Sequence, residues 1–175
     1  DFSPFGSVLP LIASHPNIIV LQTFSKAWGL AGLRVGMAFS DPRISSLFAN
    51  VKYPYNINAP TQREILRQLD SRDIAPQISM IKAERTRMAD ALPGFPCVRR
   101  VIPSDANFLL VEVDDADRLY DFLAERGVLV RNRTRIPHCR GMLRFTVGTP
   151  AENSRVLAAL ADYCKETGTY PPDTV

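Results

Sequence analysis

The 175-residue sequence lacks the features that define several large classes of proteins. No apolar run approaches the roughly 20 residues that a membrane-spanning helix needs, so no membrane span is predicted. The formal charge is only +3 and the basic residues are scattered along the chain, which argues against a nucleic-acid partner. Hydrophobic residues make up 46% and charged residues 22%, both ordinary globular values, so neither disorder nor a coiled coil is expected.

Cysteine is scarce, and its number and spacing argue against a disulfide framework and against a zinc site. The three cysteines are odd in number and form neither a CxxC pair nor a Cys/His metal-ligand pattern. We therefore expect free thiols in a reducing compartment, such as the cytoplasm, and no metal site. The adjacent pair His138-Cys139 could combine a base with a nucleophile, but neighbours in sequence usually point apart, and an ordinary loop is the simpler interpretation.

What the sequence does contain is the pattern of an α/β chain in three parts, residues 1–75, 76–94 and 95–175. Apolar and β-branched runs predict strands at residues 18–22, 33–39, 107–113, 128–131 and 142–147. Apolar residues at near-helical spacing predict helices at residues 10–16, 42–50, 59–69, 73–92, 114–126 and 151–166. We expect the first strand to be buried on both faces. The long middle helix should join the first part to a compact α+β module.

A chemically dense stretch, TFSKAWGLAGLRVG at residues 23–36, directly follows the first strand. We expect Lys26, at the mouth of that strand, to be partly desolvated, which favours the neutral amine that can form a Schiff base with an aldehyde. Thr23 and Ser25 add hydroxyl donors, and Arg34 adds a planar fork suited to phosphate. Taken singly, each charged residue could be a solvated surface group. Together they indicate a site for a phosphorylated aldehyde.

The pattern SKxxxLAGLRxG at residues 25–36 resembles the lysine motif of the class I and II aminotransferases, which are fold-type I enzymes that use pyridoxal 5'-phosphate. PYNIN at 54–58, DANF at 105–108 and LRFTVGT at 143–149 extend the resemblance, in order, over nearly the whole chain, and are similar to the histidinol-phosphate branch. The resemblance implies the C-terminal part of a fold-type I transferase, with the end of the large α/β cofactor domain followed by the small α+β domain.

The resemblance also implies roles for the four residues of the dense stretch. Lys26 would carry the pyridoxal phosphate and move the proton during transamination. Thr23, Ser25 and Arg34 match family positions that hold the cofactor phosphate.

Three further residues match positions near the substrate. Arg144 corresponds to the family arginine that pairs with the substrate α-carboxylate. Arg131 is a candidate for the substrate phosphate, although it could equally be a surface arginine. Tyr55 lies in a loop that the family places near the active site, although it could equally be a packing residue.

The function implied is transfer of an amino group between L-histidinol phosphate and 2-oxoglutarate, in histidine biosynthesis, by a cytoplasmic homodimer. The chain opens at Asp1 without an initiator methionine, and we expect it to be a C-terminal half that is inactive alone. Three alternatives stay open: an aromatic amino-acid aminotransferase, a threonine-phosphate decarboxylase, and a non-catalytic piece that acts only in assembly.

Overall fold

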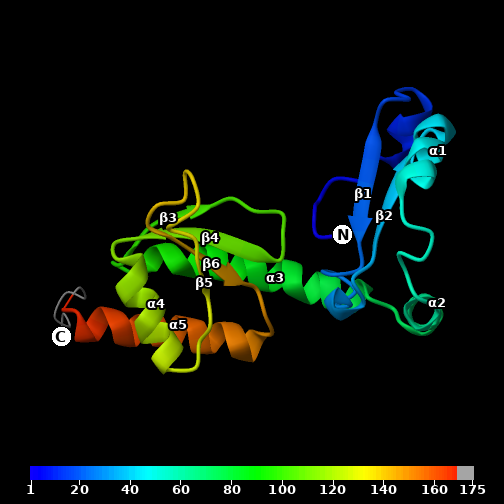
Figure 1. Ribbon diagram of the computed structural model, residues 1–175. Coiled ribbons are helices and arrows are strands. Elements are labelled where there is room, and N and C mark those ends of the chain that lie inside the picture. Colours follow the sequence, from blue (N-terminus) through cyan, green and yellow to red (C-terminus); the bar gives the residue numbers. More distant parts are fainter. Residues whose placement is uncertain (169–175) are drawn as a thin grey trace. The chain divides into compact units, whose positions relative to one another are not determined.

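The computed structural model describes residues 1–168 as two compact units (Figure 1). The N-terminal unit consists of Asp1 and Ser3–Pro76, and the C-terminal unit consists of Phe2 and the chain from Gln77. The helix expected at residues 76–94 therefore belongs to the C-terminal unit. The end of the expected third part, from residue 169, lies outside the described residues.

The N-terminal unit combines a two-stranded sheet with short helices. Its elements are η1 (Leu9–Ala13), β1 (Ile19–Thr23), η2 (Ala31–Leu33), β2 (Gly36–Ser40), α1 (Pro42–Val51) and α2 (Ala59–Ser71). β1 and β2 are antiparallel, with Thr23 opposite Gly36. Asp41 caps α1 by accepting a hydrogen bond from the Arg43 amide, and Asn58 caps α2 in the same way.

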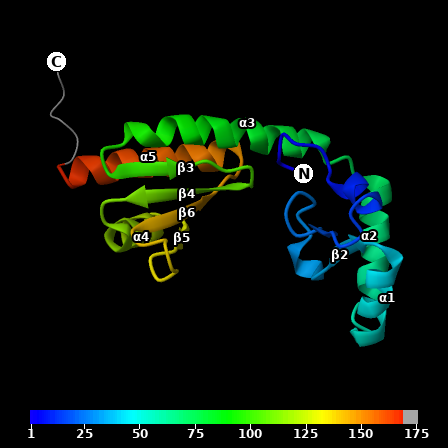
Figure 2. The ribbon, with the colours of Figure 1, turned by 90° about the horizontal axis from the view of Figure 1, so that it is seen from above.

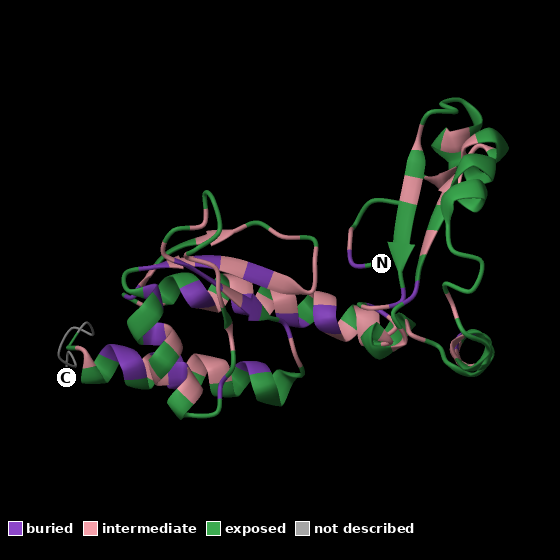
Figure 3. Ribbon diagram, in the orientation of Figure 1, coloured by how far each residue is buried: buried purple, intermediate pink, exposed green. Residues whose placement is uncertain are grey.

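The prediction that the first strand is buried on both faces is wrong in this structure. In β1 only Val20 is half-buried, and Leu21 is 77% exposed. A strand is buried on both faces only when other elements cover the sheet on both sides, and a two-stranded sheet does not supply that cover. Figure 3 shows how exposed residues dominate β1 and α1.

The C-terminal unit is a four-stranded antiparallel sheet with helices. Its elements are α3 (Ala75–Ala91), η3 (Leu92–Gly94), β3 (Val98–Ile102), β4 (Phe108–Val113), α4 (Ala116–Glu125), β5 (Arg131–Asn132), β6 (Met142–Thr146) and α5 (Pro150–Glu166). The strand order is β3-β4-β6-β5. Figure 2 shows α3 and α5 running side by side along this sheet.

Alternation along the central strands separates a buried face of the sheet from an open one. In β4, Leu109, Val111 and Val113 are buried, whereas the residues between them are half-exposed. In β6, Leu143 and Phe145 are buried and lie on the same face. The core of this unit is therefore on the helix side of the sheet.

A buried polar network ties α3 to the start of α5. Asn153 donates from Nδ2 to Glu84 Oε2 at 2.7 Å and to the Gly148 carbonyl at 3.1 Å, and its Oδ1 accepts from the Gly148 amide. Arg87 holds the same Glu84 carboxylate through two hydrogen bonds. The pKa of Glu84 is lowered, first by the hydrogen bond from Arg87 and then by that from Asn153. Since Gly148 lies two residues after the end of β6, the network fixes the segment that leads from that strand to α5.

The three cysteines are free thiols, as expected. Cys97 and Cys164 are buried with their sulfur atoms 3.3 Å apart. Burial, followed by the contact with Cys164, raises the pKa of the Cys97 thiol to about 12. Among the described residues, no helix is both long and apolar enough to cross a membrane.

Candidate functional site

The stretch from Thr23 to Gly36, which we call the lysine turn, connects β1 to β2. The Thr23 hydroxyl donates to the Val35 carbonyl at 3.5 Å, and the Phe24 amide donates to the same oxygen at 3.4 Å. The Leu30 amide donates to the Phe24 carbonyl at 3.0 Å. These bonds close the turn on the ends of both strands.

A small apolar core supports the turn from within. Phe24 and Val35 are buried against Ile65 of α2. The ring of Trp28 meets Phe24 edge-on, with 5.9 Å between the ring centroids. The apolar residues of the turn thereby fix its backbone, so its polar residues lie toward the outside.

Lys26 lies at the surface of the turn and is exposed. Its carbonyl accepts a hydrogen bond at 2.9 Å from the amide of Gly29, whose φ of 69° is one that glycine adopts without strain. The expectation that Lys26 is partly desolvated is wrong for this structure, because the residue lies in the turn beyond the end of β1 and is exposed.

Arg34 has an unusual backbone. Its φ of 57° and ψ of 42° are left-handed, a conformation that costs a residue other than glycine about 1–3 kcal/mol and is concentrated at functional sites. Its Nη1 donates to the Ala31 carbonyl at 2.9 Å, so the exposed guanidinium folds back over the turn.

The four residues that the sequence singled out here lie on one connection between β1 and β2. Thr23 and Ser25 are joined by a 3.1 Å hydrogen bond from the Ser25 amide to the Thr23 hydroxyl, and Lys26 and Arg34 lie on the same turn. The donor set is one amine, two hydroxyls and one guanidinium. This set fits a phosphorylated aldehyde, because the amine can react with the aldehyde while the other three groups bind phosphate.

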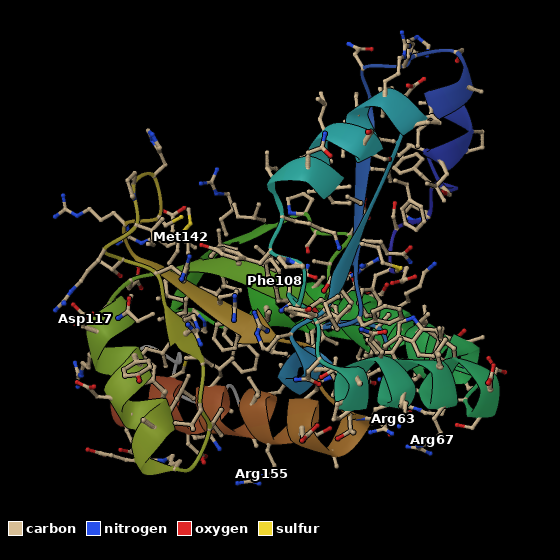
Figure 4. All side chains as sticks on the ribbon, turned by 45° about the vertical axis from the view of Figure 1, so that its right-hand side comes forward. Arg63, Arg67, Phe108, Asp117, Met142 and Arg155 are labelled. Atoms are coloured by element: carbon tan, nitrogen blue, oxygen red, sulfur yellow. The ribbon has the colours of Figure 1, made fainter. Side chains whose placement is uncertain are left out.

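A second group of candidate residues lies on the sheet of the C-terminal unit. Arg144 of β6 faces Arg131 of β5 directly across the two strands. The Arg144 guanidinium lies 5.2 Å from the centroid of the Phe108 ring, a side chain labelled in Figure 4. Its Nε is buried and has no hydrogen-bond partner among the described residues. Burial lowers the pKa of Arg144 most, followed by the charges of Arg131 and Arg133.

Tyr55 belongs to the N-terminal unit, in the loop between α1 and α2, and is 92% exposed. The alternative interpretation of Tyr55 as a packing residue is therefore wrong in this structure. No described contact of its side chain assigns it to a site.

Sequence reasoning overlooked Arg133, whose charge acts on Arg144. The signal was present, because Arg131 and Arg133 are two positions apart, and residues at that spacing share one face of a strand.

Comparison with known proteins identifies the family of this chain. A family model described as "Aminotransferase class I and II" matches residues 2–160, so the chain belongs to that family. A histidinol-phosphate aminotransferase of Parabacteroides distasonis is 48% identical over 161 residues, which cover 91% of this chain and 47% of that protein. The chain spans about half the length of the curated relatives it matches.

Two solved structures have the same fold. The histidinol-phosphate aminotransferase from Clostridium acetobutylicum has a TM-score of 0.85 at 22% identity, over 94% of this chain and 51% of that one. The enzyme of that name from Sinorhizobium meliloti, in complex with pyridoxal-5'-phosphate, has a TM-score of 0.76 at 24% identity, over 91% and 44%. At these identities the likeness establishes a fold-type I transferase fold and does not select a substrate.

Proposed function

We propose that the full-length protein carrying this chain is a pyridoxal-phosphate aminotransferase that moves an amino group between L-histidinol phosphate and 2-oxoglutarate. The observation that carries the proposal is the lysine turn, where an amine, two hydroxyls and a left-handed arginine occupy one connection between two strands. The identity of 48% to a histidinol-phosphate aminotransferase supports the choice of substrate.

The lysine turn would hold the cofactor and move the proton. When bound, pyridoxal phosphate supplies an electron sink for the charge that develops at the substrate α-carbon. Lys26 would hold the cofactor through its amine, and the same Nζ would take the proton from the substrate α-carbon. The Ser25 hydroxyl and the Arg34 guanidinium would hold the phosphate, and the Thr23 hydroxyl would do so after turning away from the Val35 carbonyl. These bonds to a charged group are worth about 1.5–3 kcal/mol each where they are shielded from water.

The arginines of the C-terminal unit would bind the anionic groups of the substrates. Arg144 suits the α-carboxylate of the amino acid, because its guanidinium is half-buried and its Nε lacks a partner. Arg131, directly opposite Arg144, suits the phosphate of histidinol phosphate. Tyr55 is the third residue that we propose for substrate binding, on the resemblance of its loop alone.

The proposal includes a cytoplasmic homodimer. Three free thiols agree with a reducing compartment. The homodimer follows from the family resemblance, and sedimentation velocity of the full-length protein tests it.

Steady-state rates on three amino donors test the proposed substrate. The full-length, cofactor-loaded protein should prefer histidinol phosphate to phenylalanine and should release no carbon dioxide from threonine phosphate. A preference for phenylalanine would identify an aromatic amino-acid aminotransferase, and release of carbon dioxide would identify a decarboxylase. Either result contradicts the proposal.

A further inference from the structure

The arginines at the edge of the C-terminal sheet share one face. Directly opposed residues of antiparallel strands point to the same side, and Arg131 opposes Arg144. The Arg133 amide donates to the Met142 carbonyl at 2.9 Å, which continues the ladder by one more pair. Arg133 directly follows β5, and its pairing with Met142 continues the alternation that places Arg131 and Arg144 on one face.

Around Arg131 and Arg144 that face is the open one, whereas Met142, opposite Arg133, is buried. Leu143 and Phe145, the neighbours of Arg144 in β6, are buried on the helix side of the sheet. Arg144 opposes Leu110 of β4, which is half-exposed. Arg131 and Arg144 therefore extend from the face of the sheet opposite its apolar core.

No described acid neutralises this group. Among residues 1–168, no ion pair involves Arg131, Arg133 or Arg144. Glu112 of β4 lies on the same face, opposite Met142, and pairs with Arg100 at 3.1 Å. Asp117 and Asp121 of α4 line a hollow of about 520 Å³ together with Arg133. Asp117, labelled in Figure 4, instead accepts a hydrogen bond from Asn132.

Three like charges on one face repel each other unless an anion lies among them. The buried, unpartnered Nε of Arg144 indicates where the anion binds. The Coulomb energy between the cluster and a ligand is proportional to the product of their charges. A third cation therefore contributes twice as much binding free energy to a dianion as to a monoanion.

We propose that Arg133 is a specificity-determining residue, which adds a third cation to the Arg131–Arg144 face and thereby selects phosphate dianions over singly charged carboxylates. This inference rests on the proposed function, since histidinol phosphate carries such a dianion. Arg133 belongs neither to the lysine motif nor to the pair of arginines, Arg131 and Arg144, that we propose for substrate binding.

Anion binding to the full-length protein tests the role of Arg133. The protein is saturated with pyridoxal phosphate, so that the cofactor's own phosphate group occupies the lysine turn. Calorimetry then compares inorganic phosphate with formate at pH 8, where phosphate is predominantly a dianion. The variants are Arg133→Gln, Arg133→Lys and Arg140→Gln. Arg140 is the matched control, because it is exposed on the same loop and its charge is not among those that shift Arg144.

We expect Arg133→Gln to weaken phosphate binding about tenfold and formate binding about threefold, because the free-energy loss doubles with the ligand charge. Arg133→Lys keeps the charge and should stay within about twofold of the natural protein, as should Arg140→Gln. Equal losses for the two anions in Arg133→Gln, no loss at all, or the same loss in Arg140→Gln would overturn the inference.

Kinetics separate this inference from the proposed function. If histidinol phosphate is the donor, Arg133→Gln should raise its KM about tenfold and leave kcat within about twofold, because the charge acts on binding. If the protein binds phosphate as expected but does not use histidinol phosphate, the proposed function fails and the anion selectivity of Arg133 stands.

Discussion

Lys26 is exposed although the turn that carries it is tightly fixed. The amides and carbonyls of Phe24, Val35 and Leu30 determine the turn, and none of them is a candidate for chemistry. The apolar residues hold the backbone, and Thr23, Lys26 and Arg34 are exposed. Since the Lys26 side chain is exposed, its replacement should affect activity rather than folding.

Replacing Lys26 with alanine tests this separation. In the full-length protein we expect Lys26→Ala to lower the transamination rate by at least about 100-fold, because the proton-transferring amine is lost. The thermal unfolding midpoint should stay within about 2 °C of the natural protein, as expected of an exposed side chain. Lys165→Ala, an exposed lysine near the end of α5, is the control and should keep its activity. Near-normal rates in Lys26→Ala would contradict the assignment of the lysine.

The thiols provide a second prediction at this scale. Cys97 and Cys164 are buried, and the raised pKa of Cys97 keeps it protonated, whereas Cys139 is only half-buried on a loop. Iodoacetamide at pH 8 should therefore alkylate Cys139 in the folded chain and the other two only after unfolding. Peptide mass mapping measures the order. Equal labelling of Cys97 and Cys139 in the folded chain would show that the core is open.

At the scale of the element, the network between α3 and α5 should make stability depend on pH. The lowered pKa of Glu84 means that its ionised form stabilises the fold above the unfolded value, near 4.5. That contribution is lost as the pH falls through the lower, folded value.

The variant Glu84→Gln measures the contribution. It should unfold at a lower urea concentration than the natural protein at pH 7, and the difference should shrink as the pH is lowered below 4.5, because the natural carboxylate then also loses its charge. Glu125→Gln, an exposed acid on α4, is the matched control. A difference between Glu84→Gln and the natural protein that stays constant down to pH 3 would show that the ionised carboxylate does not stabilise the fold.

Local signals in the sequence predicted some elements and failed for others, for physical reasons. Asp41-Pro42 correctly marked the start of α1, because capping depends on adjacent residues only. β3 was missed, because its paired arginines, Arg99 and Arg100, break the alternation, and the strand shifts register there. The expected strand at 128–131 is observed as β5 at Arg131–Asn132, because Val128 instead bonds back to the end of α4.

The part of the candidate site that lies within one short motif was also predictable, because it depends on residues that are close in the sequence. Lys26 and Arg34 lie within a single motif, so the sequence alone placed them on one turn. The contribution of Arg133 depends on its pairing with β6, a register that composition does not reveal. The exposure of Lys26 was likewise unpredictable, because it depends on what covers the sheet.

At the scale of the whole molecule, the two units differ in how well they are packed. Within the described residues, the buried apolar side chains of the N-terminal unit are limited to Phe24, Ala27, Val35 and Ile65. The large exposed apolar residues all lie in this unit, except Leu129 and Ile136. An apolar surface of this kind indicates an interface with further protein. The relatives of this chain are about twice its length, which is consistent with such cover.

Hydrogen exchange tests the difference between the units. In the isolated 175-residue chain, we expect the amides of β1 and β2 to exchange much faster than those of β4 and β6, because few buried contacts oppose local opening of the first two strands. In the full-length protein, β1 and β2 should become protected. Equal protection of all four strands in the isolated chain would contradict the claim that the N-terminal unit depends on further protein.

The same reasoning predicts that the isolated chain has no transaminase activity. It holds the lysine turn, yet the exposed sheet beneath that turn gives a bound cofactor little shielding from water. Added pyridoxal phosphate should therefore show only a weak change in its near-ultraviolet and visible absorbance. Transamination by the isolated chain would show that it is a complete catalyst.

The most direct test of the central claim is the position at which the cofactor becomes attached. The full-length protein is loaded with pyridoxal phosphate, reduced with borohydride and digested, and its peptides are weighed. The account predicts the added phosphopyridoxyl mass on the peptide that contains Lys26 and on no peptide that contains Lys52, Lys82 or Lys165. Attachment at another lysine, or no attachment in a protein that transaminates, would contradict it.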